Sequence, residues 1–201
     1  MSHSPTDLNL VDPIACYDMI TASLKQAVAS GRHGWHLLTV ASIGVDGFPE
    51  ARVVVLRGFD PIARRLAFHT DWRSPKVGEL TKNPQLSLVS YDPGTRWQLR
   101  IRATASVHHL DEPARTAWQN AQPMSRIAYA LPQSPSSELG DAAWAENPPI
   151  PDLMDEVAFA NFCLIECEYD QLEVLELRKS GNRRARLEWH DGVPQLVRIG
   201  A

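Results

Sequence analysis

The sequence of 201 residues has little cysteine, no long apolar run and no excess of positive charge. Three cysteines cannot all pair. Cys163 and Cys167 fall in an alternating apolar segment, where extended backbone would separate them by about 13 Å, beyond the roughly 7 Å Cα limit of a disulfide. No uncharged stretch approaches the roughly 20 residues that span a bilayer, and the first residues lack a cationic stretch followed by an apolar core. These absences predict reduced thiols and a cytoplasmic protein without a membrane partner.

The net charge of the chain disfavours nucleic acid as a partner. The formal net charge is -4 at pH 7, with 22% charged residues, so the chain lacks the overall positive field that nucleic-acid binding requires. We therefore expect no nucleic-acid partner, and any site for an anion must be local. The length is within the range of one domain, so residues 1–201 are expected to form a single domain.

Two glycine-rich phosphate-binding motifs are also missing. No Gly-x-Gly-x-x-Gly follows the first predicted strand, and no Gly-x-x-x-x-Gly-Lys-Ser is present. A bound phosphate would therefore need cationic side chains. The histidines at 33, 36, 108 and 109 lack acidic or cysteine ligands at supporting spacing, so no metal site is expected.

Hydrophobic periodicity predicts mainly β structure with a few helices. A helical period runs over 12–30, a short helix follows Ser74-Pro75-Lys76 and ends before Pro84, and a helical stretch over 112–130 is interrupted at Pro123. β-favouring residues between turn signals predict strands at 35–43, 50–59, 65–70, 85–91, 97–109, 161–169, 171–177, 184–190 and 195–198.

This order of elements favours one fold class. Many antiparallel strands, with helices inserted at few points, indicate a closed or nearly closed β-barrel decorated by an N-terminal helix and inserted helices. The segment 131–152 is rich in proline and serine, and it is expected to be a long loop because strands resume after it.

The candidate anion-binding residues are concentrated between positions 50 and 76. Arg52 and Arg57 flank an apolar run, and their opposite parity would aim them at opposite faces of a regular strand unless a bulge reorients one. The next strand leads into Ser74-Pro75-Lys76, where a hydroxyl, a cation and backbone donors meet at a helix N-terminus. Unpaired N–H groups and the helix dipole favour a phosphate there, and Lys76 would add charge-assisted hydrogen bonds.

These segments together resemble the flavin-binding half of the pyridoxamine 5′-phosphate oxidase family. That family has an arginine, an apolar run and a lysine, then an aromatic-Tyr-Thr strand end, then Ser-Arg-Lys and Asn-Pro. The corresponding segments here are 52–57, 68–70, 74–76 and 83–84. The similarity extends to Trp97-Gln98, to Gln133-Ser134 and to the C-terminal segment 186–189.

The resemblance implies a split β-barrel that binds FMN at the interface of a homodimer. Arg52, Lys76 and Ser74 would hold the FMN phosphate, and the flavin would carry the redox chemistry. The remaining cofactor-binding residues implied are Val53, Val54, Arg57, His69, Thr70, Gln98, Gln133, Ser134 and Arg186.

Departures from the family pattern fall mainly on the substrate side. Pro75 and His69 stand where the family has an arginine and a tyrosine, and Arg73 would compensate in part for the lost cation. The residues that correspond to substrate-binding positions are Arg57, Trp118, Gln122, Arg126 and Arg184. The differences from the family pattern predict an anionic small-molecule substrate other than, or broader than, pyridoxamine phosphate, in a pocket kept basic by the arginines. A second phosphate-bearing cofactor would fit the same charges.

The sequence is compatible with three functions. The first is an FMN-dependent oxidoreductase resembling pyridoxamine 5′-phosphate oxidase, and the alternative is a protein of the same fold that binds or shuttles flavin without turnover. The third is a single-stranded nucleic-acid module, which the aromatic and basic strands of small barrels favour and the negative net charge disfavours.

Overall fold

A computed structural model describes residues 8–140 and 155–201, in which eight strands form one antiparallel sheet. The strands are β1 (Leu37–Ile43), β2 (Pro49–Asp60), β3 (Arg65–Asp71), β4 (Gln85–Asp92), β5 (Trp97–His108), β6 (Phe162–Glu176), β7 (Arg183–His190) and β8 (Val193–Ile199). The helices are α1 (Pro13–Ala29), the short 3-10 helix η1 (Gly34–His36), α2 (Pro75–Lys82), α3 (Glu112–Asn120), α4 (Pro123–Ala130) and α6 (Asp155–Asn161).

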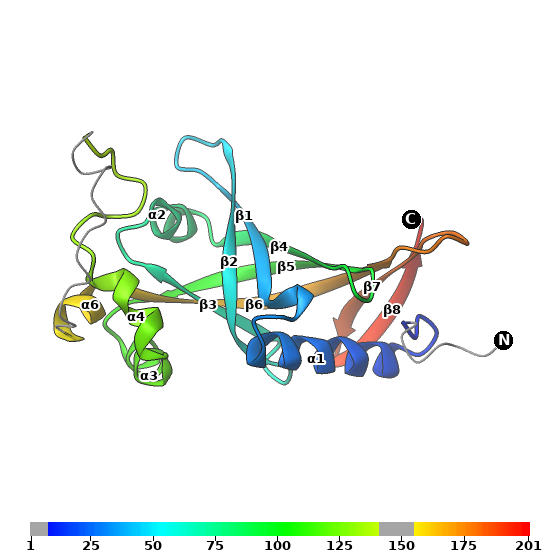
Figure 1. The fold of residues 1–201 in the computed structure, drawn as a ribbon. Helices are drawn as coiled ribbons and strands as arrows, with labels where there is room; N and C mark the ends of the chain where they lie inside the picture. Colours follow the sequence, from blue (N-terminus) through cyan, green and yellow to red (C-terminus); the bar gives the residue numbers. More distant parts are fainter. Residues whose placement is uncertain (1–7, 141–154) are drawn as a thin grey trace.

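Six of these strands close into a barrel. The sheet order is β3-β2-β1-β4-β5-β6-β7-β8, and an additional pairing of β3 with β6 joins the ring (Figure 1). That pairing extends from Arg65 opposite Glu168 to Asp71 opposite Phe162. The β7–β8 hairpin continues the sheet beyond the ring, and Asp191 and Gly192 form its two-residue turn with positive φ angles. The predicted antiparallel barrel is therefore confirmed.

Two bulges adjust the barrel strands. In β2 the register shifts between Leu56 and Gly58, which leaves Arg57 as the extra residue. In β6 the residue without a partner is Asp170, between Gln171 opposite Arg102 and Tyr169 opposite Ala103. Because the bulge at Asp170 is absorbed within the ladder, β6 is one strand, and the prediction of two strands at 161–169 and 171–177 is wrong.

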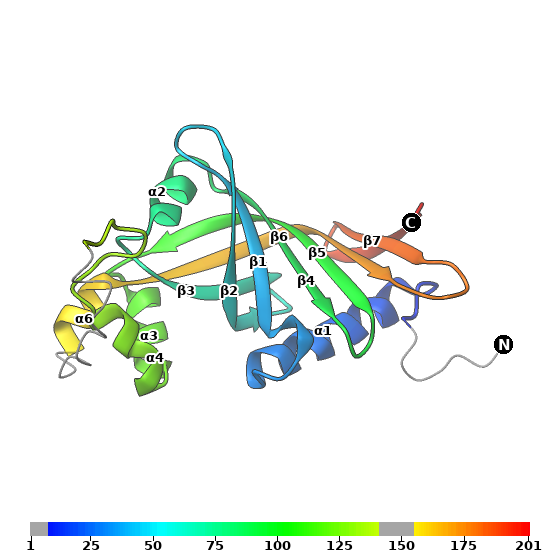
Figure 2. The ribbon, with the colours of Figure 1, turned by 45° about the horizontal axis from the view of Figure 1, so that its top comes forward.

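The helices lie at different parts of the barrel (Figure 2). Helices α3, α4 and α6 gather at one end of the long strand β6, and the β7–β8 hairpin lies toward its other end. Helix α1 is capped by Asp12, whose side chain accepts from the backbone N–H groups of Ile14 and Ala15. Helix α2 contacts β1 and β5 at the rim of the barrel.

The interior of the barrel is apolar. Alternate residues of the ring strands, such as Leu38, Leu56, Phe68 and Ile165, are buried in the main core. A second cluster, formed by Ala114, Trp118, Ala158, Phe162 and Leu164, packs α3 and α6 against the start of β6. The three cysteines are buried and unpaired, as predicted.

The structure differs from the predicted elements at two places. Trp35 belongs to η1 and not to the first strand, and α6 lies between the predicted loop and the predicted strand, where no helix was expected and only Asn161 was assigned to a strand. Of the predicted loop at 131–152, residues 131–140 form turns and irregular backbone, whereas 141–152 lie outside the described residues. None of the helices in the described ranges is long and apolar enough to cross a membrane.

Candidate functional site

Lys76 lies in the first turn of α2, beside the end of β3. Its Nζ donates to Thr70 Oγ1 at 3.0 Å and to Ser74 Oγ at 2.6 Å. Thr70 and Ser74 are buried, and Ser74 occupies the N-cap position of α2 without making a side-chain cap hydrogen bond. A cation therefore lies where the first N–H groups of α2 and the positive end of its dipole also favour an anion.

Arg52 reaches the same helix from β2. Its Nη2 donates to both carboxylate oxygens of Glu79, at 3.0 and 2.8 Å. Ser42 Oγ donates to Glu79 Oε2 at 2.6 Å and accepts from Arg52 Nη1. Glu79 is only 5% exposed, so this network fixes the guanidinium at the rim of the barrel.

The two cations predicted to hold a phosphate are neighbours. Lys76 and Glu79 are three residues apart on α2 and so share one helix face, which brings the Arg52 bound to Glu79 beside Lys76. Burial and the nearby Arg52 guanidinium lower the pKa of Lys76, and Glu79 and Asp71 oppose this change. An incoming anion would relieve the repulsion between these two cations.

A cavity of about 840 Å³ opens on the outer face of β2, β3 and β6. It is lined on the barrel side by Arg57, Gly58, His69 and Glu166, and on the other side by residues of α3 and of the α3–α4 connection. The bulge in β2 places Arg57 and Gly58 together on this face, and Arg57 Nη2 lies 3.5 Å from Ser125 Oγ. The side chains of Arg52 and Arg57 therefore lie on opposite faces of β2, as their parity predicts.

The end of β3 joins the two regions. Thr70 and His69 are consecutive, so their side chains leave the strand on opposite faces, Thr70 toward Lys76 and His69 toward the cavity. Burial, with a smaller effect of the Arg57 charge, lowers the pKa of His69 to about 4. His69 is therefore neutral at physiological pH. On β2, Val53 is exposed and Val54 is buried in the core.

Other predicted cofactor residues lie far from Lys76 in the same chain. Thr70 pairs with Cys163 on β6, and Gln98 pairs with Leu175, twelve residues further along that strand, or roughly 40 Å of extended chain. Arg184, a predicted substrate residue, also pairs with Leu175, and Arg186 pairs with Glu173, ten residues from Cys163. One chain therefore does not bring these residues to the Lys76 region.

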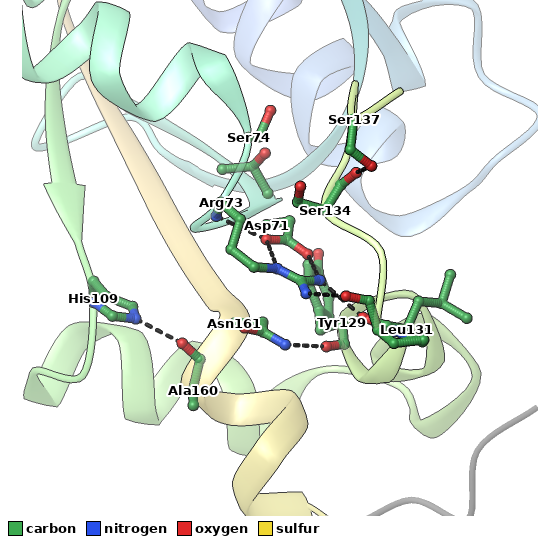
Figure 3. Close-up of polar contacts among 12 residues, drawn as sticks. Asp71, Arg73, Ser74, His109, Tyr129, Leu131, Ser134, Ser137, Ala160 and Asn161 are labelled. Atoms are coloured by element: carbon green, nitrogen blue, oxygen red, sulfur yellow. Dashed lines mark hydrogen bonds and ion pairs between the residues drawn. The ribbon is translucent and has the colours of Figure 1, made fainter. Parts of the chain in front are cut away.

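Arg73 ties the segment after α4 to the end of β3 (Figure 3). Its guanidinium donates to Asp71 at 3.0 and 2.7 Å, and to the carbonyls of Leu131 and Pro132 at 3.0 and 3.1 Å. The predicted residues Gln133 and Ser134 follow directly, so Arg73 holds their backbone near the start of α2. These partners engage the Arg73 guanidinium, and its partial compensation for the lost cation stays a prediction.

The predicted substrate residues separate into two groups. Gln122 lines the cavity with Arg57, but Trp118 is 5% exposed and packs in the second core cluster. Arg126 stacks on Trp118, 4.9 Å from the ring centroid, and donates to the carbonyls of Ala121 and Gln119. Trp118 and Arg126 therefore support the end of α3 and do not line the cavity.

The C-terminal arginines have acidic partners. Arg184 donates to Glu173 at 2.6 Å, Arg186 lies 2.7 Å from Glu188, and Arg183 pairs with Glu176. Among the described residues of one chain, Arg57 is the single cation that lines the cavity, and the contribution of the other arginines to a basic pocket stays a prediction. No group of three potential metal ligands occurs in the ranges 8–140 and 155–201.

Glu79 and Asp71 are the functional-site residues that the sequence did not reveal. Both are buried carboxylates that orient arginines. Glu79 carried a usable signal, because it follows Lys76 by three residues on a predicted helix. Asp71 carried none, because the Arg73 guanidinium that it orients donates to Leu131 and Pro132, about sixty residues away in sequence.

Comparison with known proteins agrees with this geometry. The family described as pyridoxamine 5′-phosphate oxidase, FMN-binding domain, matches residues 18–109. Residues 18–109 belong to the pyridoxamine 5′-phosphate oxidase-like FMN-binding split-barrel family, and the chain as a whole is similar to its members. The matched residues of this family member include β1 to β5, α2 and thus both cations of the barrel rim.

The chain is also similar to curated proteins named pyridoxine/pyridoxamine 5′-phosphate oxidase. It is 30% identical over 148 residues to a pyridoxine/pyridoxamine 5′-phosphate oxidase of Caulobacter vibrioides, covering 74% of this chain and 59% of that protein. It is 28% identical over 161 residues to pyridoxine/pyridoxamine 5′-phosphate oxidase 2 of Arabidopsis thaliana, covering 76% and 80%. The chain thus spans less than two thirds of the Caulobacter relative.

Solved structures extend the similarity of fold to the whole chain. An FMN-binding protein of Nostoc punctiforme, related to pyridoxamine 5′-phosphate oxidase, superposes with a TM-score of 0.72 at 24% identity and covers 100% of both chains. PhzG of Burkholderia lata, solved with tetrahydrophenazine-1-carboxylic acid, gives 0.71 at 21% identity and covers 100% of this chain and 98% of its own. This family member therefore has the split-barrel fold.

Proposed function

We propose that this protein is an FMN-dependent oxidoreductase in which Lys76 and Arg52 hold the phosphate of the cofactor. The observation that carries the proposal is the position of Lys76, whose ammonium is fixed by two buried hydroxyls at the start of α2, beside a second cation. A partly buried cation with a lowered pKa gains a favourable partner when a phosphate dianion binds. The fit of these residues to FMN is therefore good.

The chain supplies binding and orientation, whereas bound FMN supplies the hydride chemistry. Thr70 and Ser74 hold the Lys76 ammonium, and Glu79 holds the Arg52 guanidinium. Arg73 fixes the backbone that leads to Gln133 and Ser134, which we assign to the flavin. The cavity beside His69 and Arg57 is assigned to a small anionic substrate.

We further propose that two copies of the chain complete each site. Gln98 and Arg184 lie roughly 40 Å along β6 from Thr70, and Arg186 lies roughly 33 Å from it, so they reach a flavin held by Lys76 only from a second copy. Co-expression tests this assignment. A mixed dimer of Lys76→Ala and Arg186→Ala chains should recover flavin in about one of its two sites, while each variant alone binds little. Equal flavin loss in the mixture would contradict a shared site.

The cofactor assignment is tested by titrating FMN into protein stripped of ligand and following the quenching of flavin fluorescence. Lys76→Ala should weaken FMN binding by roughly 10- to 100-fold, as expected for the loss of a charge-assisted phosphate contact. Lys82→Ala is the matched control, because Lys82 lies at the other end of α2 and donates to the carbonyl of Val45. Colourless purified protein that does not bind added FMN, and so lacks flavin absorption near ~450 nm, would end the proposal.

The alternative function is flavin binding or shuttling without turnover. It is favoured by the burial of Trp118 and the occupied guanidinium of Arg126, which leave the cavity without two residues expected on its substrate side. Steady-state turnover of an amine or of NAD(P)H, monitored through the flavin absorption, separates the two functions. Multiple turnovers support the oxidoreductase, and their absence over a panel of both substrate classes supports the binding protein.

A further inference from the structure

The charges around the cavity define what it binds. Arg57 is the only cation among the described lining residues, and Glu112 and Glu166 contribute carboxylates. Glu166 is paired with Arg65 at 2.8 Å, so its charge is compensated from outside the cavity. Arg57 has a hydroxyl neighbour, Ser125, and no ion pair with the described residues. One guanidinium is thus presented to a ligand.

The neighbouring side chains do not add a second positive charge. His69 lines the cavity next to Arg57, but burial and the Arg57 charge keep its imidazole neutral at physiological pH, with a pKa of about 4. Gln122, Asn120 and Thr116 are polar and uncharged. His69 and Gln122 therefore offer hydrogen bonds to a ligand without adding charge.

The other arginines predicted for this region are held elsewhere. Arg126 stacks on Trp118 and caps carbonyls of the α3–α4 connection. Arg184 and Arg186, which a second copy would bring, are paired with Glu173 and Glu188. Their ion pairs limit the positive charge that they would contribute to a substrate.

A phosphate ester and a carboxylate make different demands on such a cavity. A phosphate monoester carries about −1.5 to −2 charges at neutral pH on three acceptor oxygens, so it needs several cationic donors. A carboxylate carries one charge on two oxygens, which match the two parallel N–H donors of a single guanidinium. The rest of the wall includes apolar residues such as Val28, Ala67, Ala117 and Leu164, which suit an apolar body.

We infer that the cavity is selective for a small apolar or aromatic acid with a single carboxylate, bound by Arg57, over a phosphate monoester. This inference rests on the proposed function, which makes the cavity the substrate site. The carboxylate would lie on the Arg57 guanidinium, within reach of the uncharged donors of His69 and Gln122, and the hydrocarbon part would lie against the apolar wall between β3 and α3.

Calorimetric titration of the flavin-loaded protein with benzoate and with phenyl phosphate at pH 7.5 tests the inference. These probes share a ring and differ in the charge of the acid group. Benzoate should bind at least about tenfold more tightly, since a poorly compensated second charge costs at least that much affinity. Arg57→Gln should abolish this preference, and Arg57→Lys should retain part of it because a charge remains without the bidentate geometry.

The control is Arg102→Gln, because Arg102 is exposed on β5 and lies outside the cavity. Equal or tighter binding of phenyl phosphate would overturn the inference, as would no measurable benzoate binding or a preference that persists in Arg57→Gln. The flavin absorption band separates this failure from failure of the proposed function. A yellow protein without the preference refutes only the substrate class, whereas a protein that does not bind FMN refutes the cofactor assignment.

Discussion

Arg73 binds the carboxylate of Asp71 through two hydrogen bonds, of 3.0 and 2.7 Å, and the same guanidinium donates to the carbonyls of Leu131 and Pro132. Asp71 is 6% exposed, so its charge depends on this partner. The pair therefore connects the end of β3 to the segment that follows α4, across a gap of about sixty residues in sequence. Asn161 adds a parallel link, from its Nδ2 to the carbonyl of Tyr129 at 2.9 Å.

Replacing Arg73 should loosen this connection. Arg73→Gln leaves a buried carboxylate without its cation, so the free energy of unfolding should fall by about 2–4 kcal/mol in urea titrations. Hydrogen exchange at 133–134 should accelerate, and FMN should dissociate faster. Arg73→Lys should restore stability in part but not the slow exchange, because one ammonium does not reach all four acceptors. Unchanged exchange at 133–134 in Arg73→Gln would contradict the positioning role.

The ion pair between Arg52 and Glu79 should be strongly coupled. Glu79→Gln should reduce the free energy of unfolding by about 2–3 kcal/mol, because the buried network with Ser42 loses its charged acceptor. Arg52→Gln should cost a similar amount, and the double variant should cost less than the sum by about 1–3 kcal/mol. Urea denaturation of the four proteins measures this coupling, and additive effects would show that the pair is energetically independent.

His69 should make the protein sensitive to mild acid. Its pKa is about 4 in the folded protein and 6.5 as the ordinary value, so the folded state binds fewer protons between these values. The free energy of unfolding should therefore fall as the pH falls from 6.5 to 4, by up to about 3 kcal/mol before allowance for partial exposure. His69→Gln should flatten the profile in this window. Asp60, Asp92 and Asp111 have lowered pKa values and lose their stabilising charge only at more acidic pH. They therefore affect the free energy of unfolding below the pH window of His69.

Trp118 should affect stability more than ligand binding. Trp118→Ala removes a buried ring that packs edge-on against Phe162, at 5.2 Å, and Tyr129, at 6.0 Å, so the free energy of unfolding should fall by about 3–5 kcal/mol. Trp118→Phe should cost less. The control is Met124→Ala on α4, whose side chain is 76% exposed. If Trp118→Phe remained stable but lost affinity for benzoate, the side chain would have a direct part in the cavity.

Local signals in the sequence accounted for the elements that depend on neighbouring residues. The helix that begins after Asp12 and the turn at Asp191-Gly192 were predictable because caps and positive φ angles act within a few residues. The continuity of β6 was not, because Asp170 has the polarity of a turn residue and only the partner strands show that a bulge accommodates it.

The same difference between local and distant contacts decides which parts of the candidate site could be predicted. The positions of Thr70, Ser74 and Lys76 follow from a strand that leads directly into a helix, so their proximity was predictable. The roles of Arg73, Trp118 and Arg126 were not, because each is decided by contacts with another segment of the fold. Residue type alone made the two arginines look like anion ligands, although both donate to backbone carbonyls.

The extra residue in β2 contributes its side chain to the cavity and not to the core of the barrel. Leu56 before the bulge and Phe59 after it both pack on the core, although their spacing breaks a regular alternation, and Arg57 stands outside that packing. A new side chain at 57 therefore alters the charge offered to a ligand without disturbing the interior. A substitution at 57 is therefore expected to change which acid groups the cavity accepts while the free energy of unfolding stays nearly the same.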